Sequence, residues 1–269
     1  MLKTRILTAL VIAPIALLGL FYLSVPNFKW FLLLILLVSG WEWANFARLQ
    51  PLARIAYASG VGALFFVSSH FLILWLAGAG LWWITALWLI GQYPSQSARW
   101  QRPAVIGLIG LVTLIPAGAS LMWLKVQSDA ATVLLLLLIL IWAADIGAYF
   151  VGRRFGLRKL LPNVSPGKSV EGLVGGLVIA VIAGFATLEL MPKVDGRALG
   201  YAAWLMLFLG IGLVSVLGDL TLSMFKRGRG IKDSSQLLPG HGGFLDRLDS
   251  LFSAAPIYCS ALYLAASLK

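Results

Sequence analysis

Long apolar runs separated by short polar segments fill the chain from end to end. Nine runs stand out, at residues 6–22, 28–47, 55–76, 81–90, 105–124, 133–151, 173–191, 201–222 and 251–268. A helix that crosses a bilayer needs about 20 mostly apolar residues, so the fourth run is short and is expected to tilt, re-enter or merge with its neighbour. The pattern predicts an all-α polytopic integral membrane protein with about nine transmembrane helices.

Composition agrees with a membrane protein and excludes several other classes. The 269 residues are 60% hydrophobic and only 12% charged, whereas about a quarter of a soluble domain is charged. Cys259 is the single cysteine, which excludes a disulfide framework, and His70 and His241 are too far apart in sequence to indicate a zinc site. The first run follows Lys3 and Arg5 as in a signal peptide, but without a small-residue cleavage site it is expected to be retained.

The placement of positive charge predicts the orientation. If the N-terminus is cytoplasmic and nine spans alternate, most of the 21 lysines and arginines fall in cytoplasmic segments, as the positive-inside rule requires. The C-terminus then lies on the opposite side, and the two basic loops, 152–172 and 223–249, face the cytoplasm. We expect residues 1–130 to form about five N-terminal spans and residues 131–269 a catalytic region of about four.

The segment from Asp219 to Asp249 concentrates charge and glycine in this apolar chain. If the preceding helix continues through the basic cluster, Asp219, Ser223 and Lys226 project from one stripe, because they are four and three residues apart. Asp246 and Asp249 are three apart at the start of the next apolar run, where a helix N-terminus tolerates carboxylates. The spacing therefore predicts carboxylates and a cation from two successive helices at one place.

Glycines and carboxylates together indicate phosphate chemistry in this segment. Gly242 and Gly243 lack side chains, so backbone N–H groups can approach a ligand closely. Carboxylates suit Mg²⁺, which takes one or two of them and completes its shell with water and phosphate; Mn²⁺ would also fit, and a second cation such as K⁺ would make a two-ion clamp. A solvated basic loop is the alternative, but it leaves the glycines and the aspartate spacing unexplained.

A resemblance to a known family rests on this segment. It reads Ser-x-x-Lys-Arg from Ser223, Lys-Asp at 232–233, and Pro-x-His-Gly-Gly-x-x-Asp-Arg-x-Asp ending at Asp249, which is similar to the signature of the phosphatidate cytidylyltransferases, or CDP-diacylglycerol synthases. The resemblance implies an enzyme of phospholipid biosynthesis that converts CTP and phosphatidic acid to CDP-diacylglycerol and pyrophosphate. It also implies a homodimer in the bacterial inner membrane, with the active site facing the cytoplasm. No nucleic acid is expected as a partner.

Two further blocks extend the resemblance. Asp145 begins Asp-x-x-Ala-Tyr-Phe-x-Gly-Arg inside an apolar run, where a carboxylate is costly without a partner or cavity. Ser-Pro-Gly-Lys168-Ser169-x-Glu-Gly resembles a second block of the family, in which threonine is common at the position of Ser169. Gly-Lys-Ser also imitates the end of a P-loop, but Pro162 replaces the required glycine and no strand is expected before it.

These observations assign expected roles. Asp219 and Asp246 are the expected metal ligands, with Asp249 in a supporting or alternate position, and these three together with Lys226 form the catalytic group. The remaining residues are expected to bind substrate, through charge, hydroxyl groups or backbone amides: Asp145, Lys168, Ser169, Ser223, Arg227, Lys232, His241, Gly242, Gly243 and Arg247. A phosphate nucleophile is already ionised at neutral pH, so His241 is expected to bind rather than to transfer protons.

Other polar residues have less specific interpretations. Glu42 lies near the end of the second run, and its side chain is expected to snorkel or to form a structural pair rather than to take part in chemistry. His70 is expected to be packed or interfacial. The spacing Gly172-x-x-Gly175 predicts close helix packing. Alternative functions are a cytidylyltransferase for another lipid phosphate, a transporter of anionic lipid, and a membrane anchor.

Overall fold

The computed structural model describes residues 2–191 and 200–267, and almost all of this part of the chain is helical. Its nine long helices are α1 (Leu2–Tyr22), α2 (Val25–Phe46), α3 (Pro51–Ser68), α4 (Leu72–Gly91), α6 (Pro103–Lys125), α7 (Ala130–Phe155), α8 (Val170–Leu190), α9 (Tyr201–Arg229) and α10 (Asp249–Ser267). Short helical turns are η1 (Ser69–Phe71), α5 (Ser97–Trp100) and η3 (Leu245–Arg247). The prediction of an all-α polytopic membrane protein is confirmed.

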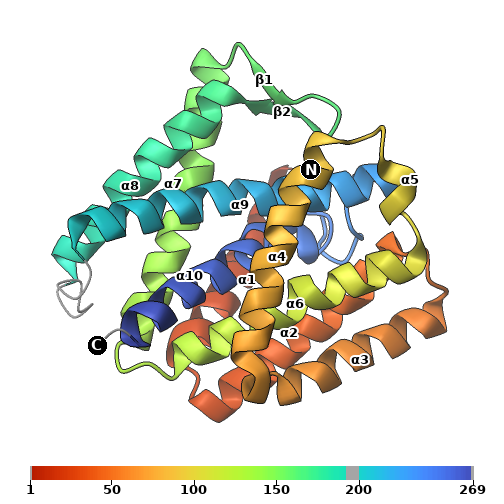
Figure 1. Ribbon diagram of the computed structural model, residues 1–269, viewed down its shortest axis with the longest axis horizontal. Coiled ribbons are helices and arrows are strands. Elements are labelled where there is room, and N and C mark those ends of the chain that lie inside the picture. Colours follow the sequence, from red (N-terminus) through yellow and green to blue (C-terminus); the bar gives the residue numbers. More distant parts are fainter. Residues whose placement is uncertain (1, 192–199, 268–269) are drawn as a thin grey trace.

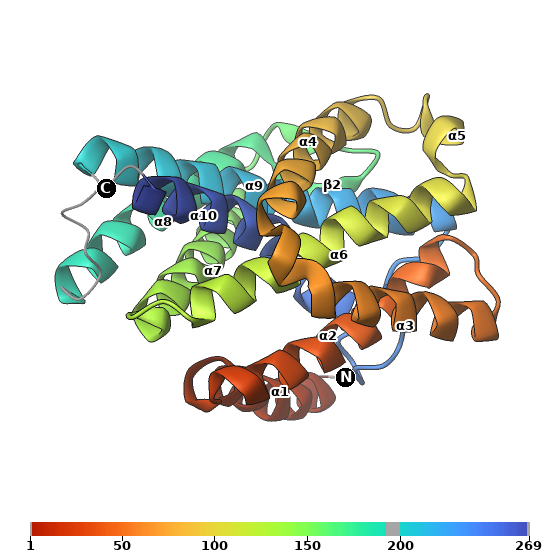
Figure 2. The same ribbon diagram turned by 60° about the horizontal axis from the view of Figure 1, so that its bottom comes forward.

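Proline and glycine mark several helix ends. α2, α3 and α6 each have a proline in the first turn, where its missing N–H costs nothing because that group would have no helical partner. α9 ends at Gly230, whose φ of 77° is the left-handed conformation that closes a helix C-terminus. Figure 2 shows α1 beside α2 at one edge of the bundle and α8 beside α9 at the opposite edge.

The boundary between the third and fourth apolar runs differs from the prediction. We expected spans at 55–76 and 81–90, but α3 ends at Ser68 and α4 begins at Leu72, so the fourth helix has 20 residues and is not short. The polar sequence Ser68–His70 forms the bend, whereas Gly78 and Gly80 lie within α4 with open space around them. Glycine is tolerated inside membrane helices, so it was a poor boundary marker here.

Seven stretches of the described residues are long and apolar enough to cross a membrane by length and composition. This count treats Pro51–Gly91 as one stretch of 41 residues and leaves out α1, whose apolar part is Leu10–Tyr22. Because α3 and α4 are separated by η1, the nine predicted runs still correspond to nine helices in the described chain. Nine crossings therefore remain a prediction.

The N-terminal end of α1 lies beside the second basic loop. The Thr8 hydroxyl donates a hydrogen bond of 2.9 Å to the carbonyl of Pro239. Loops 152–172 and 223–249 also meet, because Arg227 Nε donates to the carbonyl of Val164 at 3.4 Å. The first part of α1 and both loops thus lie at one end of the bundle, as the predicted topology requires, while the assignment of that end to the cytoplasm stays a prediction.

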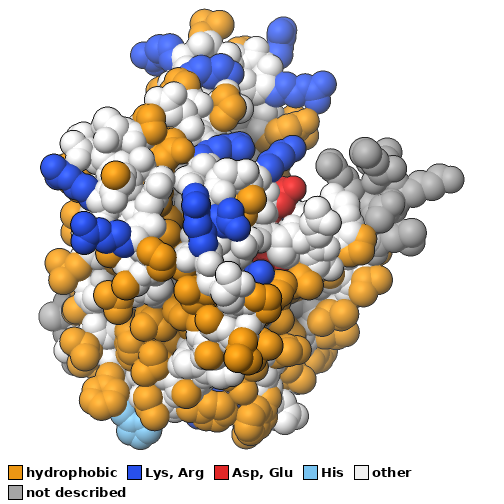
Figure 3. Space-filling model, turned by 90° about the vertical axis from the view of Figure 1, so that its right-hand side faces the viewer, with side chains coloured by type: hydrophobic (Ala, Val, Ile, Leu, Met, Phe, Trp, Pro, Cys, Tyr) orange, Lys and Arg blue, Asp and Glu red, His pale blue; other side chains and the backbone are white. Residues whose placement is uncertain are grey.

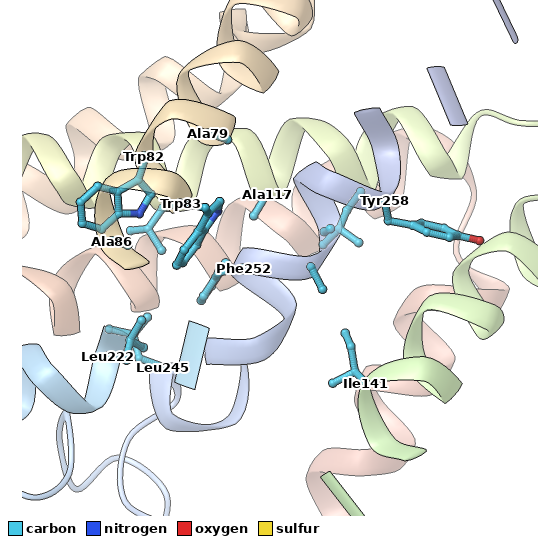
Figure 4. Packing of buried hydrophobic residues seen from close by; sticks show 14 of the residues in the cluster. Ala79, Trp82, Trp83, Ala86, Ala117, Ile141, Leu222, Leu245, Phe252 and Tyr258 are labelled. Atoms are coloured by element: carbon cyan, nitrogen blue, oxygen red, sulfur yellow. The ribbon is translucent and has the colours of Figure 1, made fainter. Parts of the chain in front are cut away.

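One apolar core joins the two predicted regions of the chain. Trp82 and Trp83 of α4, Phe252 and Tyr258 of α10 and small residues of α4 and α6 belong to one buried hydrophobic cluster (Figure 4). Phe225 of α9 makes ring contacts with Trp82 at 6.4 Å and with residues of α2 and α5. The division near residue 130 remains untested as a domain boundary, but packing is continuous across it.

The surface carries large apolar side chains, as expected for a protein surrounded by lipid. Tyr22, Leu52 and Leu157 are more than three-quarters exposed, which in water would be a liability. Figure 3 shows lysine and arginine side chains gathered over the upper part of one face and a mainly hydrophobic surface below them. His70 is exposed in η1, so a packed histidine is the wrong interpretation and the interfacial one remains.

Close packing of α7 on α8 confirms the role predicted for the small residues there. A Cβ atom at Gly175 would lie 2.5 Å from the Val151 side chain, and one at Gly176 would lie 2.5 Å from the Ala144 carbonyl oxygen. Real Cβ atoms do not approach so closely, so the two helix backbones can meet only because these residues are glycine.

Replacing Gly176 by valine is therefore expected to force α7 and α8 apart. The clash is with backbone, which cannot rotate away, so we expect a loss of about 1–3 kcal/mol, as for other overpacked sites. Thermal unfolding of the purified protein in detergent measures it. Gly78→Val in α4, where an added Cβ atom would meet nothing within 4 Å, is the matched control; an equal loss in both variants would contradict the packing explanation.

Candidate active site

A polar cavity of about 560 Å³ lies where α7, α8, α9 and α10 meet the two basic loops. Residues from both loops line it, so the structure brings together segments that are far apart in sequence. Five carboxylates and four cations line the cavity: Asp145, Asp219, Asp233, Asp246 and Asp249, with Arg153, Lys168, Lys226 and Arg247. Such a mixture suits a substrate that carries several negative charges and a metal ion.

Helix α9 supplies the predicted stripe of polar residues. It continues through the basic cluster to Arg229, so Asp219, Ser223 and Lys226 lie on consecutive turns. The Ser223 hydroxyl donates to Asp219 Oδ1 at 3.2 Å. Lys226 lies in the last turns of the helix, where a cation is stabilised by the helix dipole.

A small hairpin carries Lys168 to Asp219. Strands β1 (Lys159–Leu161) and β2 (Ser165–Ser169) pair antiparallel and project from the ends of α7 and α8 (Figure 1). Lys168 Nζ lies 2.6 Å from Asp219 Oδ2. The expectation that no strand precedes Gly-Lys-Ser was wrong, since β1 precedes it. A hydrogen-bonded pair this short leaves no clear sequence pattern. Pro162 still excludes a P-loop.

Ser169 acts locally as a helix cap. Its Oγ accepts a hydrogen bond of 3.1 Å from the Gly172 amide and so satisfies one free N–H at the start of α8. A Cβ at Gly156 would approach the same hydroxyl to 2.6 Å. Ser169 also lines the cavity, so the predicted phosphate contact would use a hydroxyl that already holds the helix end.

Asp246 is fully engaged by donors of the chain itself. Oδ1 pairs with Lys226 Nζ at 2.7 Å, and Oδ2 accepts from the Ser234 amide at 2.9 Å, the Ser234 hydroxyl at 3.1 Å and the Gly243 amide at 3.0 Å. Burial alone would raise the pKa of Asp246, but the hydrogen bond and charge of Lys226 and the two amides outweigh it and hold that pKa below its usual value. Asp246 lies in η3, one turn before α10.

Asp249 is the first residue of α10 and accepts a hydrogen bond of 2.8 Å from the Ser250 amide. The start of α10 lies against α9, because a Cβ at Gly218 would be only 2.6 Å from the Asp249 carbonyl oxygen. Asp249 and Asp219 therefore come from closely packed backbones and line the same cavity, together with Asp145 from α7.

The donor set fits a metal that needs few protein ligands. No group of three or more His, Cys, Asp or Glu side chains in the described residues forms a complete metal cage. Mg²⁺ does not need one, since it binds through one or two carboxylates and keeps its other positions for water and phosphate. Asp219 and Asp249 accept fewer hydrogen bonds than Asp246, so they fit such an ion better than the predicted pair of Asp219 and Asp246.

A second polar cavity, of about 740 Å³, adjoins the first and shares Asp233 and Arg247 with it. Lys232, His241 and Gly242 line this cavity rather than the first. The structure thus places most of the predicted site residues in two neighbouring polar spaces, while Ser223, Arg227 and Gly243 line neither of them.

Other predicted residues are engaged within the protein. Arg227 lines neither polar cavity and instead bonds the Val164 carbonyl. The amides of His241 and Gly242 donate to the Leu238 carbonyl, and that of Gly243 donates to Asp246. The phosphate cradle predicted for these amides stays a prediction, and it would require those bonds to be exchanged for bonds to substrate.

Sequence reasoning missed two residues of the first cavity and did not foresee how Glu42 supports the loop beside it. Asp233 and Arg153 line the first cavity and were quoted only as parts of longer motifs; their charge inside those motifs was the available signal. Glu42 lies beneath the second basic loop and accepts four hydrogen bonds from it. The pairing expected for Glu42 is confirmed, while the snorkelling alternative is wrong because the residue is fully buried.

Comparison with known proteins covers nearly the whole chain. The sequence matches the cytidylyltransferase family over residues 3–265, which includes every residue of both polar cavities. The chain belongs to the cytidylyltransferase family. The match spans α1 to α10, so the family relationship covers the membrane helices as well as the charged loops.

Two phosphatidate cytidylyltransferases match along nearly their whole length, and a third protein matches about half of this chain. The phosphatidate cytidylyltransferase of Pseudomonas aeruginosa is 45% identical over 98% of each chain. That of Haemophilus influenzae is 40% identical over 96% of this chain and 97% of the relative. An uncharacterized Escherichia coli protein, YnbB, is 43% identical over 48% of this chain.

Proposed function

We propose that this membrane protein transfers a cytidylyl group from CTP to phosphatidic acid and so makes CDP-diacylglycerol and pyrophosphate for phospholipid biosynthesis. The observation that carries the proposal is the meeting of a polar and an apolar cavity. Asp145, Arg247, Asp249 and Ser250 line both of them. A substrate with a phosphate head and two hydrocarbon tails requires such a junction.

The apolar cavity has a volume of about 440 Å³ and lies between α1, α2, α7 and α10. Ile15, Leu32, Ile141 and Leu251 are typical of its lining. Acyl chains gain by contact with such side chains, while Arg247 at the junction carries a charge opposite to that of the lipid phosphate. The full-length relatives with the phosphatidate cytidylyltransferase name support this choice of lipid.

The chemistry follows from the charges. An oxygen of the lipid phosphate attacks the α-phosphorus of CTP, the bond from that phosphorus to the oxygen bridging to the β-phosphorus breaks, and pyrophosphate leaves with the electron pair. Both reactants are anions, so the protein chiefly reduces repulsion and aligns them. Lys168, Lys226, Arg153 and Arg247 provide positive charge in the polar cavity.

Asp219 and Asp249 are the proposed ligands of Mg²⁺ or Mn²⁺, and Asp145, which lines the same cavity, is the proposed ligand of a second cation such as K⁺. Such an ion supplies charge neutralisation at the nucleotide phosphates. In this proposal Asp246 fixes Lys226 instead of holding the metal, since its Oδ1 pairs with Lys226 and its Oδ2 already accepts three hydrogen bonds.

The cellular setting is part of the proposal. The bacterial relatives and the basic loops support a location in the inner membrane with the polar cavities facing the cytoplasm, where CTP is found. The proposed assembly is a homodimer, which rests on the family resemblance and is tested by the molar mass of the protein in detergent.

The decisive experiment supplies the purified protein with labelled CTP, Mg²⁺ and phosphatidic acid in detergent micelles. We expect a CMP-bearing lipid and pyrophosphate in equal amounts, and no product when a chelator removes the metal. Parallel reactions replace phosphatidic acid by an isoprenoid phosphate, or CTP by ATP. Equal product with the isoprenoid phosphate would overturn the lipid assignment, and equal product with ATP would overturn the nucleotide assignment.

A further inference from the structure

Glu42 is a charged side chain deep inside the protein, and its four hydrogen bonds all come from one loop. It lies near the end of α2 with 0% of its surface exposed. Oε2 accepts from the Ser234 hydroxyl at 2.9 Å and the Leu245 amide at 2.6 Å, and Oε1 accepts from the Phe244 amide at 2.8 Å and the Ser235 hydroxyl. A buried carboxylate is tolerated only when donors surround it in this way.

These four donors come from both ends of the loop segment 234–245. Ser234 and Ser235 lie just after Asp233, and Phe244 and Leu245 lie just before Asp246. Glu42 therefore pins the two ends of the segment to one point on α2, and the residues between them form the rim of the second polar cavity. The loop has little regular secondary structure of its own, so the hydrogen bonds to Glu42 hold it in place where helix or strand hydrogen bonds are missing.

Ser234 connects Glu42 to the polar cavity. Its single hydroxyl proton is shared between Glu42 Oε2 at 2.9 Å and Asp246 Oδ2 at 3.1 Å, and its amide also donates to Asp246. Gly243 allows this approach, because a Cβ there would overlap the Ser234 hydroxyl and lie 2.9 Å from Glu42 Oε1. Asp246 in turn pairs with Lys226 at 2.7 Å. A continuous chain of contacts thus runs from α2 to the cation in the cavity.

We infer that Glu42 is a positioning residue for the cytidylyl transfer, acting through Ser234 on Asp246 and Lys226. The inference rests on the proposed function and adds a residue that lines none of the three cavities described above. Because Glu42 touches no cavity, its loss misaligns Lys226 without removing a group that contacts substrate. Rate is therefore expected to suffer more than binding.

Glu42→Gln is the principal variant because it preserves size and removes the charge. A glutamine retains one acceptor oxygen, but its NH₂ group must face either the Leu245 or the Phe244 amide, and two donors then oppose each other. The matched control is Ser39→Ala, one turn earlier on the same helix. Ser39 is also fully buried, and its hydroxyl has no hydrogen-bond partner in the described part of the chain.

With CTP, Mg²⁺ and phosphatidic acid, Glu42→Gln is expected to lower kcat about 10- to 100-fold, the scale found for groups that orient a site from behind, with KM for both substrates within about threefold. Ser39→Ala keeps the kcat of the unmodified protein. Ser234→Ala also lowers kcat, and the double variant loses less than the product of the two single losses, because both changes break the same chain of contacts.

Hydrogen exchange provides a readout that does not depend on activity. In Glu42→Gln the amides of residues 234–246 are expected to exchange faster while those of α7 and α8 are unchanged. Faster exchange throughout the protein, an unchanged kcat in Glu42→Gln, or losses that multiply in the double variant would each overturn the inference.

If Glu42→Gln does not fold, Ser234→Ala decides alone: unchanged kcat and unchanged exchange at residues 243–246 would overturn the inference. An unmodified protein without cytidylyltransferase activity would instead overturn the proposed function, and the exchange experiment would still test the loop contacts.

Discussion

Asp219→Asn is expected to abolish cytidylyl transfer, with a fall in kcat of about a thousandfold or more. The substitution keeps the shape of the side chain but removes the charge that pairs with Lys168 at 2.6 Å and that would hold the metal beside Asp249. Groups that stabilise charge in a water-poor site commonly contribute effects of this size. Steady-state turnover over a range of Mg²⁺ concentrations measures the loss, and added Mg²⁺ should restore little of it.

Glu189→Gln is the matched control for this experiment. It removes one carboxylate charge from an exposed position near the far end of α8, so turnover should not change. Near-normal turnover in Asp219→Asn would remove this residue from the metal site, and an equal loss in the control would indicate a general effect of charge rather than a local one.

Lys226→Met is expected to cost both stability and activity. The Lys226 and Asp246 side chains are only 11% and 5% exposed, so the substitution leaves a buried carboxylate without its cation. Breaking a buried ion pair from one side costs about 3–5 kcal/mol. Thermal unfolding in detergent should show this loss, and the assay should show turnover near background because a cation has left the polar cavity.

The double variant Lys226→Met, Asp246→Asn separates the two effects. With the unpaired charge also removed, stability should recover by a substantial part of the loss in the single variant, while activity stays near background. Stability losses that simply add would contradict the ion pair, and turnover that recovers with stability would show that Lys226 serves the fold and not the reaction.

Regular structure made part of the site predictable from sequence. Asp219, Ser223 and Lys226 were expected on one stripe, and they lie so because α9 continues without interruption to Arg229. The short distance from Asp246 to the start of α10 was likewise expected from spacing. In both cases the spacing of residues along a helix directly determines the relative positions of their side chains.

Contacts made by irregular backbone could not be predicted in this way. The donors to Asp246 come from Ser234 and Gly243, whose positions depend on how the loop folds. The partners of Glu42 are about 190 to 200 residues away in sequence. A carboxylate in an apolar run indicates that some partner exists, but a single sequence holds no information about which distant segment supplies it.

The predicted start of α4 was wrong for a different reason. Glycines near residue 80 were expected to form a loop, yet they lie within α4, and the bend falls at residues 69–71, of which Ser69 and His70 are polar. In a protein surrounded by lipid, backbone groups without hydrogen bonds are costly, so a helix is interrupted where polar residues can satisfy them. Polar side chains were therefore a better guide to the helix boundary than glycine.

Cys259, the single cysteine of the chain, is completely buried in α10. A thiol enclosed by neighbouring helices is shielded from water-soluble maleimides while the protein is folded. The natural sequence is thus a ready background for attaching one fluorophore or spin label at a chosen engineered cysteine, without first deleting a native thiol. Placed in turn at exposed Leu157 and at Tyr22, such a label would report which side of intact vesicles each end of the bundle occupies.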